Sequence, residues 1–392
     1  MTDRVDVVIA GAGPAGAHCA RLLSRRGLSV TLVERHRLPR YKACGGGLPV
    51  KALRLLDIDV SAALEVEVRE ALVTCCGNRP VVIKYPAAVG WMVMRDTFDH
   101  ILADGAADAG ARICEGETVR TVAEEPDCCR IETTRRTLRA DYLIGADGAN
   151  STVARTVAGH GAVKKEVAVA GEIFVSPADL ERQGPRASFD FGAVPDGYSW
   201  IFPKKDHFSI GLYSSGERLS DLKRRLVDFI GREPVLRNYS KLTLRGHLLP
   251  RGDELPLYGT KRIFLCGDAG GMVDPFFGEG IYYALKSASI ATEELCRRMA
   301  GDSDERVYTV AIKEQIGRDL AYARMMAMKF YRSVERYYGL MENNPAIQKA
   351  FTGIITGEYS FRECFFKSLL ALPFSVLPKR GPSPSGGLSA IS

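Results

Sequence analysis

The sequence predicts an α/β fold with a second domain of α+β type. The chain opens with a short apolar run, residues 6–10, that ends in a glycine-rich turn, as a buried parallel strand does. A similar change from apolar run to glycine turn returns within 140–151 and again within 262–281. Between these segments, residues 61–94 and 166–249 alternate apolar and polar side chains, a pattern typical of antiparallel strands.

The composition is that of an ordinary globular chain. At about 150 residues per domain, 392 residues suggest two or three domains. A hydrophobic content of 46% and a charged content of 26% exclude a disordered or collagen-like chain. The net charge, 53 − 47 = +6, is small and scattered, so we expect no nucleic-acid partner.

Cysteines and histidines give no sign of a metal. The chain has 10 cysteines but no CxxC, and its six histidines lack HxH or HExxH spacing. We therefore expect no metal site and no disulfide scaffold. The N-terminus does not resemble a signal peptide, and no apolar run is long enough to span a bilayer. We expect a cytoplasmic protein with reduced thiols.

The first 34 residues have the pattern of a strand–helix–strand unit. The first turn reads GAGPAG and follows the GxGxxG pattern, with glycines at Gly11, Gly13 and Gly16. A helix is expected over 17–26 and a second strand over 29–33, directly before Glu34. Glycine turn, helix and acid in this order predict a Rossmann-like dinucleotide-binding unit.

Each residue of this turn has a physical reason. Gly11 permits the tight turn, and Gly13 lets the backbone approach a pyrophosphate. Gly16 lets the helix lie close to the strand, while its free N–H groups and dipole attract the anion. Glu34 is expected to accept hydrogen bonds from an adenosine ribose.

The later glycine turns favour FAD over NAD. Asp147 and Gly148 follow one apolar run, and Gly267 and Asp268 follow the other. Asp268, at the end of a strand, suits a polyol such as the ribityl chain. The amides of 278–281 open a helix where an oxygen of an isoalloxazine ring can sit. Together the three turns predict an FAD-binding domain built from discontinuous segments.

Four further motifs resemble one family. They are PRYKACGGGLP at 39–49, VMRDTFDHIL at 93–102, YSWIFP at 198–203, and GDAGG followed by GEGI at 267–281. In these the chain is most similar to the geranylgeranyl reductase family, within the glutathione-reductase-like flavoproteins of hydroxybenzoate-hydroxylase fold. The resemblance covers about the first 300 residues.

The resemblance implies a set of site residues. Those implied to contact FAD, besides the turn glycines Gly11, Gly13 and Gly16, are Ala15, Glu34, Cys44, Gly45, Gly47, Arg95, Val119, Asp268, Gly280 and Ile281. Those implied to bind a prenyl substrate are Tyr198, Trp200, Phe202, Pro203 and Gly211. Those expected to take part in catalysis are Cys44, Tyr198 and Trp200. One departure bears on the width of the pocket, because the family continues to Gly-x-Gly where this chain has Gly211 and then Tyr213.

The residues themselves agree with this reading. Glycines 45–47 remove side chains from a stretch of backbone, so a flat ring could lie against it. Cys44 would then lie at the flavin, where its sulfur packs against the ring or acts as a weak proton donor. The alternative is that Cys44 is a buried apolar cysteine without a role at the flavin. Alternation places Tyr198, Trp200 and Phe202 on one face of a strand, either as a lipid pocket or as ordinary core.

The expected activity is FAD-dependent reduction of isolated C=C bonds in a geranylgeranyl or other prenyl chain, by hydride transfer from reduced flavin. A second nucleotide-binding unit is missing from the sequence, so electrons would come from NAD(P)H bound transiently or from a ferredoxin. The alternatives on the same fold are a flavin monooxygenase or halogenase, and a flavin-dependent isoprenoid cyclase. The prenyl carrier is open: diphosphate, chlorophyll, membrane lipid or quinone.

The domain boundaries follow from these segments. The FAD-binding domain is expected to take 1–60, 95–160 and 250–300, and the substrate domain 61–94 and 161–249. A helical region is expected over 301–380 and a disordered tail over 381–392. Residues 368–378, apolar with basic flanks, suggest peripheral contact with a membrane or packing against the body of the protein.

Overall fold

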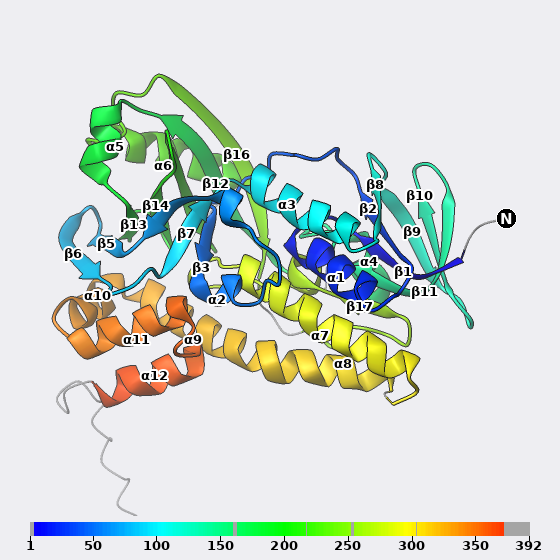
Figure 1. Ribbon diagram of the computed structural model, residues 1–392. Coiled ribbons are helices and arrows are strands. Elements are labelled where there is room, and N and C mark those ends of the chain that lie inside the picture. The colour runs from blue at the N-terminus through cyan, green and yellow to red at the C-terminus, as the bar shows by residue number, and fades with distance from the viewer. Residues whose placement is uncertain (1–3, 160–162, 217, 252–254, 303, 372–392) are drawn as a thin grey trace, which may run out of the picture.

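In the computed structural model, the described residues are 4–159, 163–216, 218–251, 255–302 and 304–371. The α/β class is confirmed: seven-stranded and three-stranded sheets are combined with helices on several faces. Figure 1 shows the chain, with the N-terminal sheet on the right and the second large sheet on the left.

The N-terminal sheet has the strand order β8-β2-β1-β11-β10-β9, with β17 also paired to β11. Its strands are β1 (Arg4–Ala10), β2 (Val30–Glu34), β8 (Arg112–Glu115), β9 (Val119–Glu124), β10 (Cys129–Thr133), β11 (Thr137–Gly145) and β17 (Ile263–Leu265). β1 pairs in parallel with β2 and β11, so the glycine turns after β1 and β11 meet at one edge. The three predicted nucleotide segments are therefore neighbours in one sheet.

The second large sheet has the order β16-β12-β15-β14-β13-β5-β6. Its strands are β5 (Glu70–Cys75), β6 (Asn78–Lys84), β12 (Lys165–Phe174), β13 (Arg186–Phe191), β14 (Gly197–Pro203), β15 (Phe208–Ser214) and β16 (Lys241–Pro250). A small sheet joins β3 (Gly47–Pro49), β7 (Gly90–Val93) and β4 (Leu64–Val68). Through β3, this small sheet joins the backbone that follows Cys44 to β7 and β4, which lie in the segment 61–94 predicted for the second domain.

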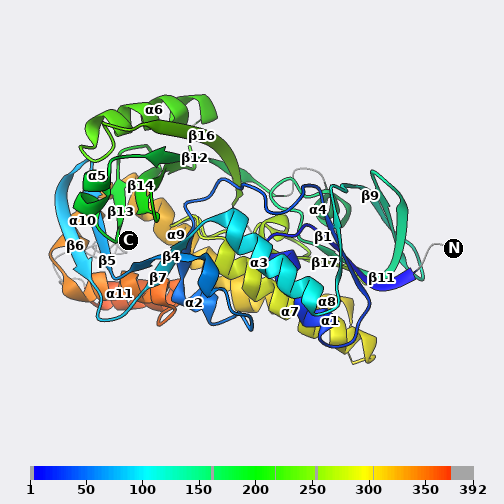
Figure 2. The ribbon, with the colours of Figure 1, turned by 45° about the horizontal axis from the view of Figure 1, so that its top comes forward.

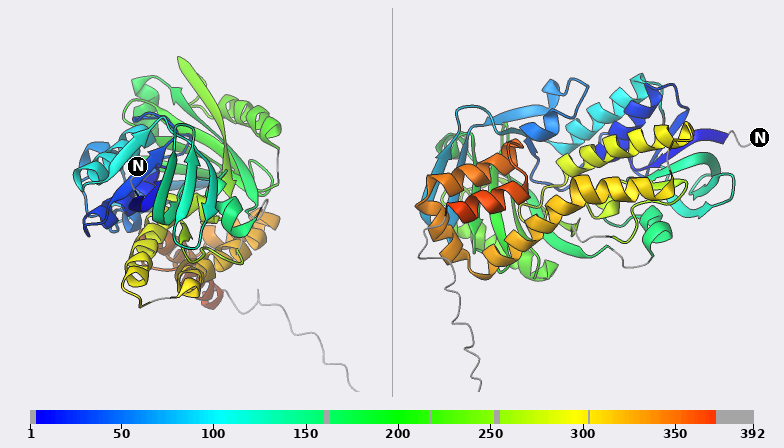
Figure 3. Two further views of the ribbon diagram at one scale, coloured as in Figure 1. Left: turned by 90° about the vertical axis from the view of Figure 1, so that its right-hand side faces the viewer. Right: turned by 90° about the horizontal axis from the view of Figure 1, so that it is seen from below.

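Helices pack on both large sheets. Those of the first half are α1 (Pro14–Ser24), α2 (Val50–Leu53), α3 (Arg95–Asp108), α4 (Thr152–Ala158), α5 (Pro177–Gln183) and α6 (Leu219–Arg232). Those of the second half are α7 (Ile281–Met299), α8 (Glu305–Ile312), α9 (Arg318–Arg332), α10 (Val334–Glu342), α11 (Pro345–Thr356) and α12 (Phe361–Leu370). Seen from below, α7 to α12 form a continuous layer beneath the sheets (Figure 3).

The second sheet is buried on both faces, and its alternation separates two cores. One face carries Val169, Ile210 and Leu212, which pack against Leu222 and Leu226 of α6. The opposite face carries small residues and aromatic rings that pack toward α9, α10 and α11. Figure 2 shows α6 on one side of this sheet and α11 on the other.

The structure corrects two details of the predicted second domain. β5 pairs with β13 in parallel, not antiparallel, with Ala71 beside Ala187. The segment 166–249 also contains α5 and α6, where only strands were expected. α1 begins at Pro14, earlier than predicted, because proline is well suited to the first turn of a helix.

The C-terminal predictions fall partly outside the described residues. The helical character after residue 284 is confirmed through Leu370, the end of α12. Residues 372–378 of the apolar segment and the predicted tail at 381–392 lie outside the described part of the chain. Among the described helices, none combines the length and apolar character needed to cross a membrane. The division into domains stays a prediction.

Candidate active site

The turn between β1 and α1 is shaped by close backbone contacts. A Cβ built on Gly11, which has φ +98°, would lie 2.4 Å from the carbonyl oxygen of Ala146. A Cβ on Gly16 would lie 1.9 Å from the carbonyl oxygen of Gly11. At Gly13, in contrast, the nearest atom is a guanidinium nitrogen of Arg40 at 4.0 Å. The protein thus leaves space beside Gly13, at a helix N-terminus without a side-chain cap, and this space suits an anion.

A buried charged network lies beside this turn. A carboxylate oxygen of Glu34 accepts a hydrogen bond of 2.8 Å from the N–H of Ala12. Arg40 lies 3.6 Å from Glu34 and donates to Asp99 at 2.8 Å. Arg95, only 5% exposed, pairs with both oxygens of Asp99 at 2.8 Å. Burial alone would raise the pKa of Asp99, but the guanidiniums of Arg95 and Arg40 outweigh burial and lower it.

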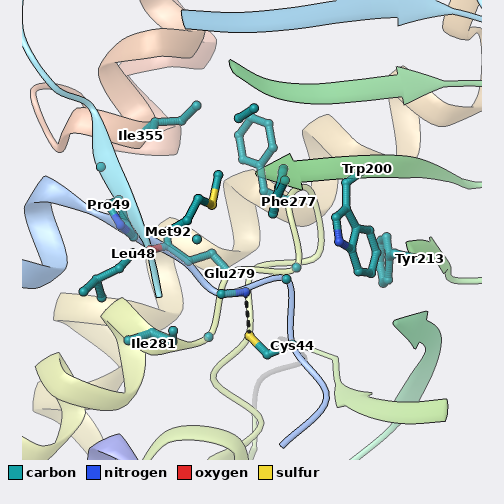
Figure 4. Close-up of a pocket in the computed structure, with 18 of the residues that line it drawn as sticks. Cys44, Leu48, Pro49, Met92, Trp200, Tyr213, Phe277, Glu279, Ile281 and Ile355 are labelled. Atoms are coloured by element: carbon teal, nitrogen blue, oxygen red, sulfur yellow. Dashed lines mark hydrogen bonds between the residues drawn. The ribbon is translucent and has the colours of Figure 1, made fainter. Parts of the chain in front are cut away.

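A buried lysine holds the Cys-Gly-Gly-Gly loop, residues 44–47, through hydrogen bonds. Lys204 Nζ donates to the carbonyl oxygens of Gly45 at 3.0 Å and Val93 at 2.7 Å. Burial lowers the pKa of Lys204. Gly46 has φ +70°, and a Cβ there would lie 2.1 Å from the oxygen of Val93. The Gly46 N–H donates to Cys44 Sγ at 3.3 Å, so the sulfur is held at the loop (Figure 4).

The segment between β17 and α7 forms a second loop near the first. Asp268 lies 3.8 Å from the ammonium of Lys42. Asp274 is fully buried and accepts hydrogen bonds from the N–H groups of Phe276 at 2.7 Å and Phe277 at 3.1 Å. Burial raises the pKa of Asp274 to about 7. The Asp274 side chain therefore fixes the loop that leads into α7.

A cavity of about 250 Å³ lies between these loops and the second sheet. Predicted site residues that line it are Cys44, Gly45, Gly47, Arg95, Tyr198, Trp200, Phe202, Asp268, Gly280 and Ile281. Apolar residues from β4, β5, β13 and α11 complete the lining, among them Val68, Ala71, Ala187, Phe189, Ile354 and Ile355. Figure 4 shows the cavity between Cys44, Trp200 and Ile355. The nucleotide-binding loops thus border one part of this cavity. The apolar residues of β4, β5, β13 and α11 border the other part, which we call the apolar arm.

The remaining predicted residues do not line this cavity. Gly11, Gly13, Ala15, Gly16 and Glu34 lie at the turn after β1 and at the end of β2. Val119 begins β9 and is buried in the core of the N-terminal sheet. Pro203 ends β14 and pairs with Phe208. Gly211 lies behind the indole of Trp200, as described next.

The aromatic residues of β14 follow one another along one face of the strand, as their alternation predicts. The ring centres of Tyr198 and Trp200 are 6.1 Å apart, and those of Trp200 and Phe202 6.2 Å. A Cβ on Gly211 would lie 2.2 Å from the indole Cζ2, so the indole lies flat against bare backbone. A Cβ on Gly45 would lie 2.9 Å from the Phe202 ring. Glycines on two elements therefore make room for these rings.

Tyr213 is the residue that the sequence analysis singled out as a departure from the expected Gly-x-Gly pattern. Its ring lines the cavity, 5.6 Å from the ring centre of Tyr198. Its hydroxyl hydrogen bonds with the buried Glu166 and lies 3.2 Å from the carbonyl oxygen of Pro275. The side chain is 2% exposed and anchored at its tip, so it closes this side of the cavity (Figure 4).

An ion pair in the cavity wall was missed by the sequence analysis. Lys51 of α2 pairs with Glu279 at 2.5 Å, and both residues line the cavity. The second oxygen of Glu279 is buried without a hydrogen-bond partner among the described residues. The Lys51 ammonium also lies 4.6 Å from the ring centre of Tyr282. A lone lysine in the apolar stretch after Pro49 was a possible signal, because a buried lysine needs a partner.

Two more residues of the site carried no signal in the sequence. Lys204 follows the aromatic strand, and only folding brings it under the Cys-Gly-Gly-Gly loop. His247 of β16 also lines the cavity. Burial lowers the pKa of His247 to about 4, with the ammonium of Lys42 as a further cause, so its imidazole is neutral at pH 7.

The described residues fit FAD. The open position at Gly13 suits a pyrophosphate, and Glu34 retains lone pairs for a ribose. The bare backbone at Gly45 and Gly47 and the loop before Gly280 border a space in which a flat ring fits.

Comparison with known proteins agrees with this arrangement. A family model described as an FAD binding domain matches residues 4–194. A geranylgeranyl diphosphate reductase of Rhodobacter capsulatus is 30% identical over 85% of this chain and 86% of its own length. A menaquinone reductase of Mycolicibacterium smegmatis is 29% identical over 84% of this chain and 85% of its own. An uncharacterized protein of Methanosarcina barkeri is 30% identical over 96% of both chains.

Solved structures show the same fold. A geranylgeranyl bacteriochlorophyll reductase-like protein of Thermoplasma acidophilum superposes with a TM-score of 0.78 at 24% identity, over 94% of this chain and 96% of its own. A flavin-dependent brominase superposes with a TM-score of 0.73 at 21% identity, over 91% of this chain and 94% of its own. At these identities the likeness concerns the fold alone.

Proposed function

The chain belongs to the geranylgeranyl reductase family of FAD-binding oxidoreductases, and from this premise we propose that it reduces isolated C=C bonds in a prenyl chain. The observation that carries the proposal is the shared cavity. Loops suited to FAD border one part of it, and apolar side chains from the second sheet and α11 border the other. A prenyl chain in the apolar arm would lie next to a flavin at the loops.

The cofactor would be held by residues at some distance from the cavity as well as in it. The N-terminus of α1 and Gly13 bind the pyrophosphate, and Glu34 binds the ribose. Arg95 and Asp268 line the cavity and hold the ring and its polyol chain. Val119 of β9 and Ala15 of α1 would contact the nucleotide. When bound, reduced FAD supplies hydride chemistry.

The protein's part in the reaction is orientation and exclusion of water. An isolated alkene is unpolarised, so holding it at the right distance contributes most of the rate. Trp200 and Phe202 pack closely against Gly45 and border the space proposed for the flavin ring, while Tyr213 closes one side of the cavity. These side chains hold the alkene in a dry space at the loop.

The second hydrogen of the product must arrive as a proton. Tyr198 donates its hydroxyl proton to the carbonyl oxygen of Phe277, so this proton is already engaged. The sulfur of Cys44 accepts a hydrogen bond from the N–H of Gly46 and also interacts with the guanidinium of Arg95. None of the described residues accepts its S–H, so this proton remains available to the cavity. The indole N–H of Trp200 has no partner among the described residues. We therefore assign donation of the proton to Cys44 and positioning of the substrate to Trp200.

The test is product analysis without oxygen. Dithionite-reduced enzyme is incubated anaerobically with prenyl diphosphates, prenylated quinones, prenylated chlorophylls and archaeal-type prenyl lipids, and the products are analysed by mass spectrometry. Addition of two hydrogen atoms per double bond supports the proposal and identifies the carrier. Stopped-flow reduction of the bound flavin by NADPH or by reduced ferredoxin identifies the electron donor.

The same experiment separates the alternatives. A monooxygenase or halogenase of this fold converts its substrate only when oxygen is supplied. A cyclase gives a product of unchanged mass. Conversion only in air, or an isomeric product, would therefore contradict prenyl reduction.

We further propose that α12 contacts an anionic membrane surface. Its exposed apolar side chains are Phe366, Leu369 and Leu370, the last of them 86% exposed. Lys367 and Arg362 lie on the same helix and are exposed. Apolar side chains with basic neighbours favour the surface of an anionic bilayer, and such a location suits delivery of a lipid substrate.

A further inference from the structure

A second, smaller cavity lies directly behind the apolar arm of the first. It has a volume of about 40 Å³ and an entirely apolar accessible surface, between β5, β13 and the helices α9, α10 and α11. Its lining overlaps that of the first cavity at Ala71, Tyr85, Phe189, Phe277 and Ile355. The two cavities are therefore neighbours that share part of their lining.

Of these shared side chains, Phe277 is best placed to act as the partition. Its backbone is fixed, because its N–H donates to Asp274 at 3.1 Å and its carbonyl oxygen accepts from Tyr198. Its ring lies among other rings, 4.7 Å from the ring centre of Phe276 and 6.2 Å from that of Phe361. Figure 4 shows it between Met92 and the strand of Trp200.

The other shared residues are held by their elements or partners: Tyr85 forms a side-chain hydrogen bond with Thr352, and Ile355 belongs to the last turn of α11. Phe189 is in the middle of β13, with its ring 5.2 Å from that of Phe202 and 5.9 Å from that of Tyr198. Ala71 has no side chain that could turn aside. On the opposite side of the first cavity, Tyr213 is anchored at its hydroxyl. A long apolar ligand that outgrows the first cavity would therefore have to pass Phe277 to reach the second.

An empty apolar cavity is unfavourable, because its lining atoms lack packing partners and water does not fill it well. An apolar chain end that entered it would bury more surface and gain affinity. Resting on the proposed function, we propose that Phe277 limits the length of the prenyl chain that the enzyme accepts, by closing the first cavity off from a second in which further isoprene units would otherwise lie.

The experiment measures binding, not turnover. Dissociation constants of geraniol, farnesol and geranylgeraniol are measured by titration of the FAD-loaded protein, with quenching of the two tryptophans as the signal. Wild type, Phe277→Ala and Phe351→Ala are compared. Phe351 lines the second cavity only, so its truncation enlarges that cavity without removing the partition.

For the wild type we expect affinity to level off with chain length. For Phe277→Ala we expect the longest alcohol to bind about tenfold more tightly, because one further isoprene unit becomes buried. For Phe351→Ala the length profile should match the wild type. Phe277→Leu, a smaller change with the same expected direction, replaces Phe277→Ala if the latter fails to fold.

The outcomes separate the inference from the proposed function. An unchanged length profile in Phe277→Ala, or an equal shift in Phe351→Ala, would overturn the role of Phe277 while leaving prenyl reduction intact. Failure of the wild-type protein to bind any prenyl alcohol would overturn the proposed function, and the inference with it.

Discussion

Gly211 lies directly behind the indole of Trp200, and its missing side chain is what allows the indole to lie flat on β15. A Cβ at residue 211 would come within 2.2 Å of the indole and 2.4 Å of the carbonyl oxygen of Val169. Gly211 thus shapes the cavity through Trp200 and does not line it.

Gly211→Ala is therefore expected to push the indole into the cavity. Overpacking of this kind costs about 1–3 kcal/mol in the free energy of unfolding, measured by urea titration. We also expect weaker prenyl-alcohol binding with unchanged FAD content. Gly231→Ala is the control, since no atom lies within 4 Å of a Cβ at that helical position and a gain of up to about 1 kcal/mol is expected there. Equal stability of the two variants would contradict this account.

The glycines of the first turn should separate folding from FAD binding. Gly13→Val finds open space in the protein, so the fold should persist while the pyrophosphate is excluded and purified protein is colourless. Gly16→Ala meets the carbonyl oxygen of Gly11 at 1.9 Å, so it should lower the stability of the protein even without flavin. Absorbance of bound flavin and thermal unfolding distinguish the two. Full flavin occupancy in Gly13→Val would remove the assignment of this turn.

Lys204→Met tests how the Cys-Gly-Gly-Gly loop is held. The change leaves the carbonyl oxygens of Gly45 and Val93 without their lysine donor, at a cost of about 1–3 kcal/mol. We expect FAD affinity to fall about tenfold, because the loop borders the proposed ring site. Lys205→Met, at the exposed neighbouring residue, is the control. It should change neither the free energy of unfolding nor the FAD affinity. Equal FAD affinity of both variants would show that the loop keeps its shape without Lys204.

The sequence pattern predicted those parts of the structure that are determined by residues close together along the chain. The strand–turn–helix unit and the shared face of Tyr198, Trp200 and Phe202 follow from spacing alone, and the structure has both. The parallel pairing of β5 with β13 did not follow, because alternation specifies which face a residue takes and not the direction of the partner strand.

Lys51 and Lys204 could not be predicted from the sequence for a related reason. Lys51 meets Glu279, and Lys204 meets Gly45, across more than 150 positions of the chain. Nothing in the sequence near either lysine specifies such a partner. The family resemblance supplied Cys44, Arg95 and Asp268, and all three line the cavity. It did not supply Tyr213 as a residue of the cavity wall.

His18 should make stability depend on pH in the acid range. It lies on α1, 2% exposed, and burial lowers its pKa from 6.5 to about 4. Below pH 6.5 the unfolded chain takes up the proton and the folded protein does not, so stability falls as pH falls from 6.5 to 4. The full effect is up to about 3 kcal/mol. In His18→Gln the loss of stability between pH 7 and pH 5, measured by urea unfolding, should be smaller.

The exposed His36 serves as the control for this measurement, because His36→Gln removes an imidazole without removing a buried one. The pH dependence of that variant should match the wild type. An equally steep loss of stability in His18→Gln would show that other groups, such as the paired carboxylate of Asp99, account for acid sensitivity.

The exposed face of α12 predicts binding to anionic vesicles. Phe366→Glu together with Leu370→Glu replaces two exposed apolar side chains by carboxylates, which an anionic surface repels and an apolar layer excludes. We expect co-flotation with phosphatidylglycerol-containing vesicles to fall several-fold, with FAD content unchanged. Val227→Glu on α6, at a residue 57% exposed, is the matched control and should float as the wild type does. If all three proteins float equally, the contact lies elsewhere on the molecule. If the wild type stays with neither neutral nor anionic vesicles, then α12 meets no lipid surface and the substrate must reach the cavity from solution.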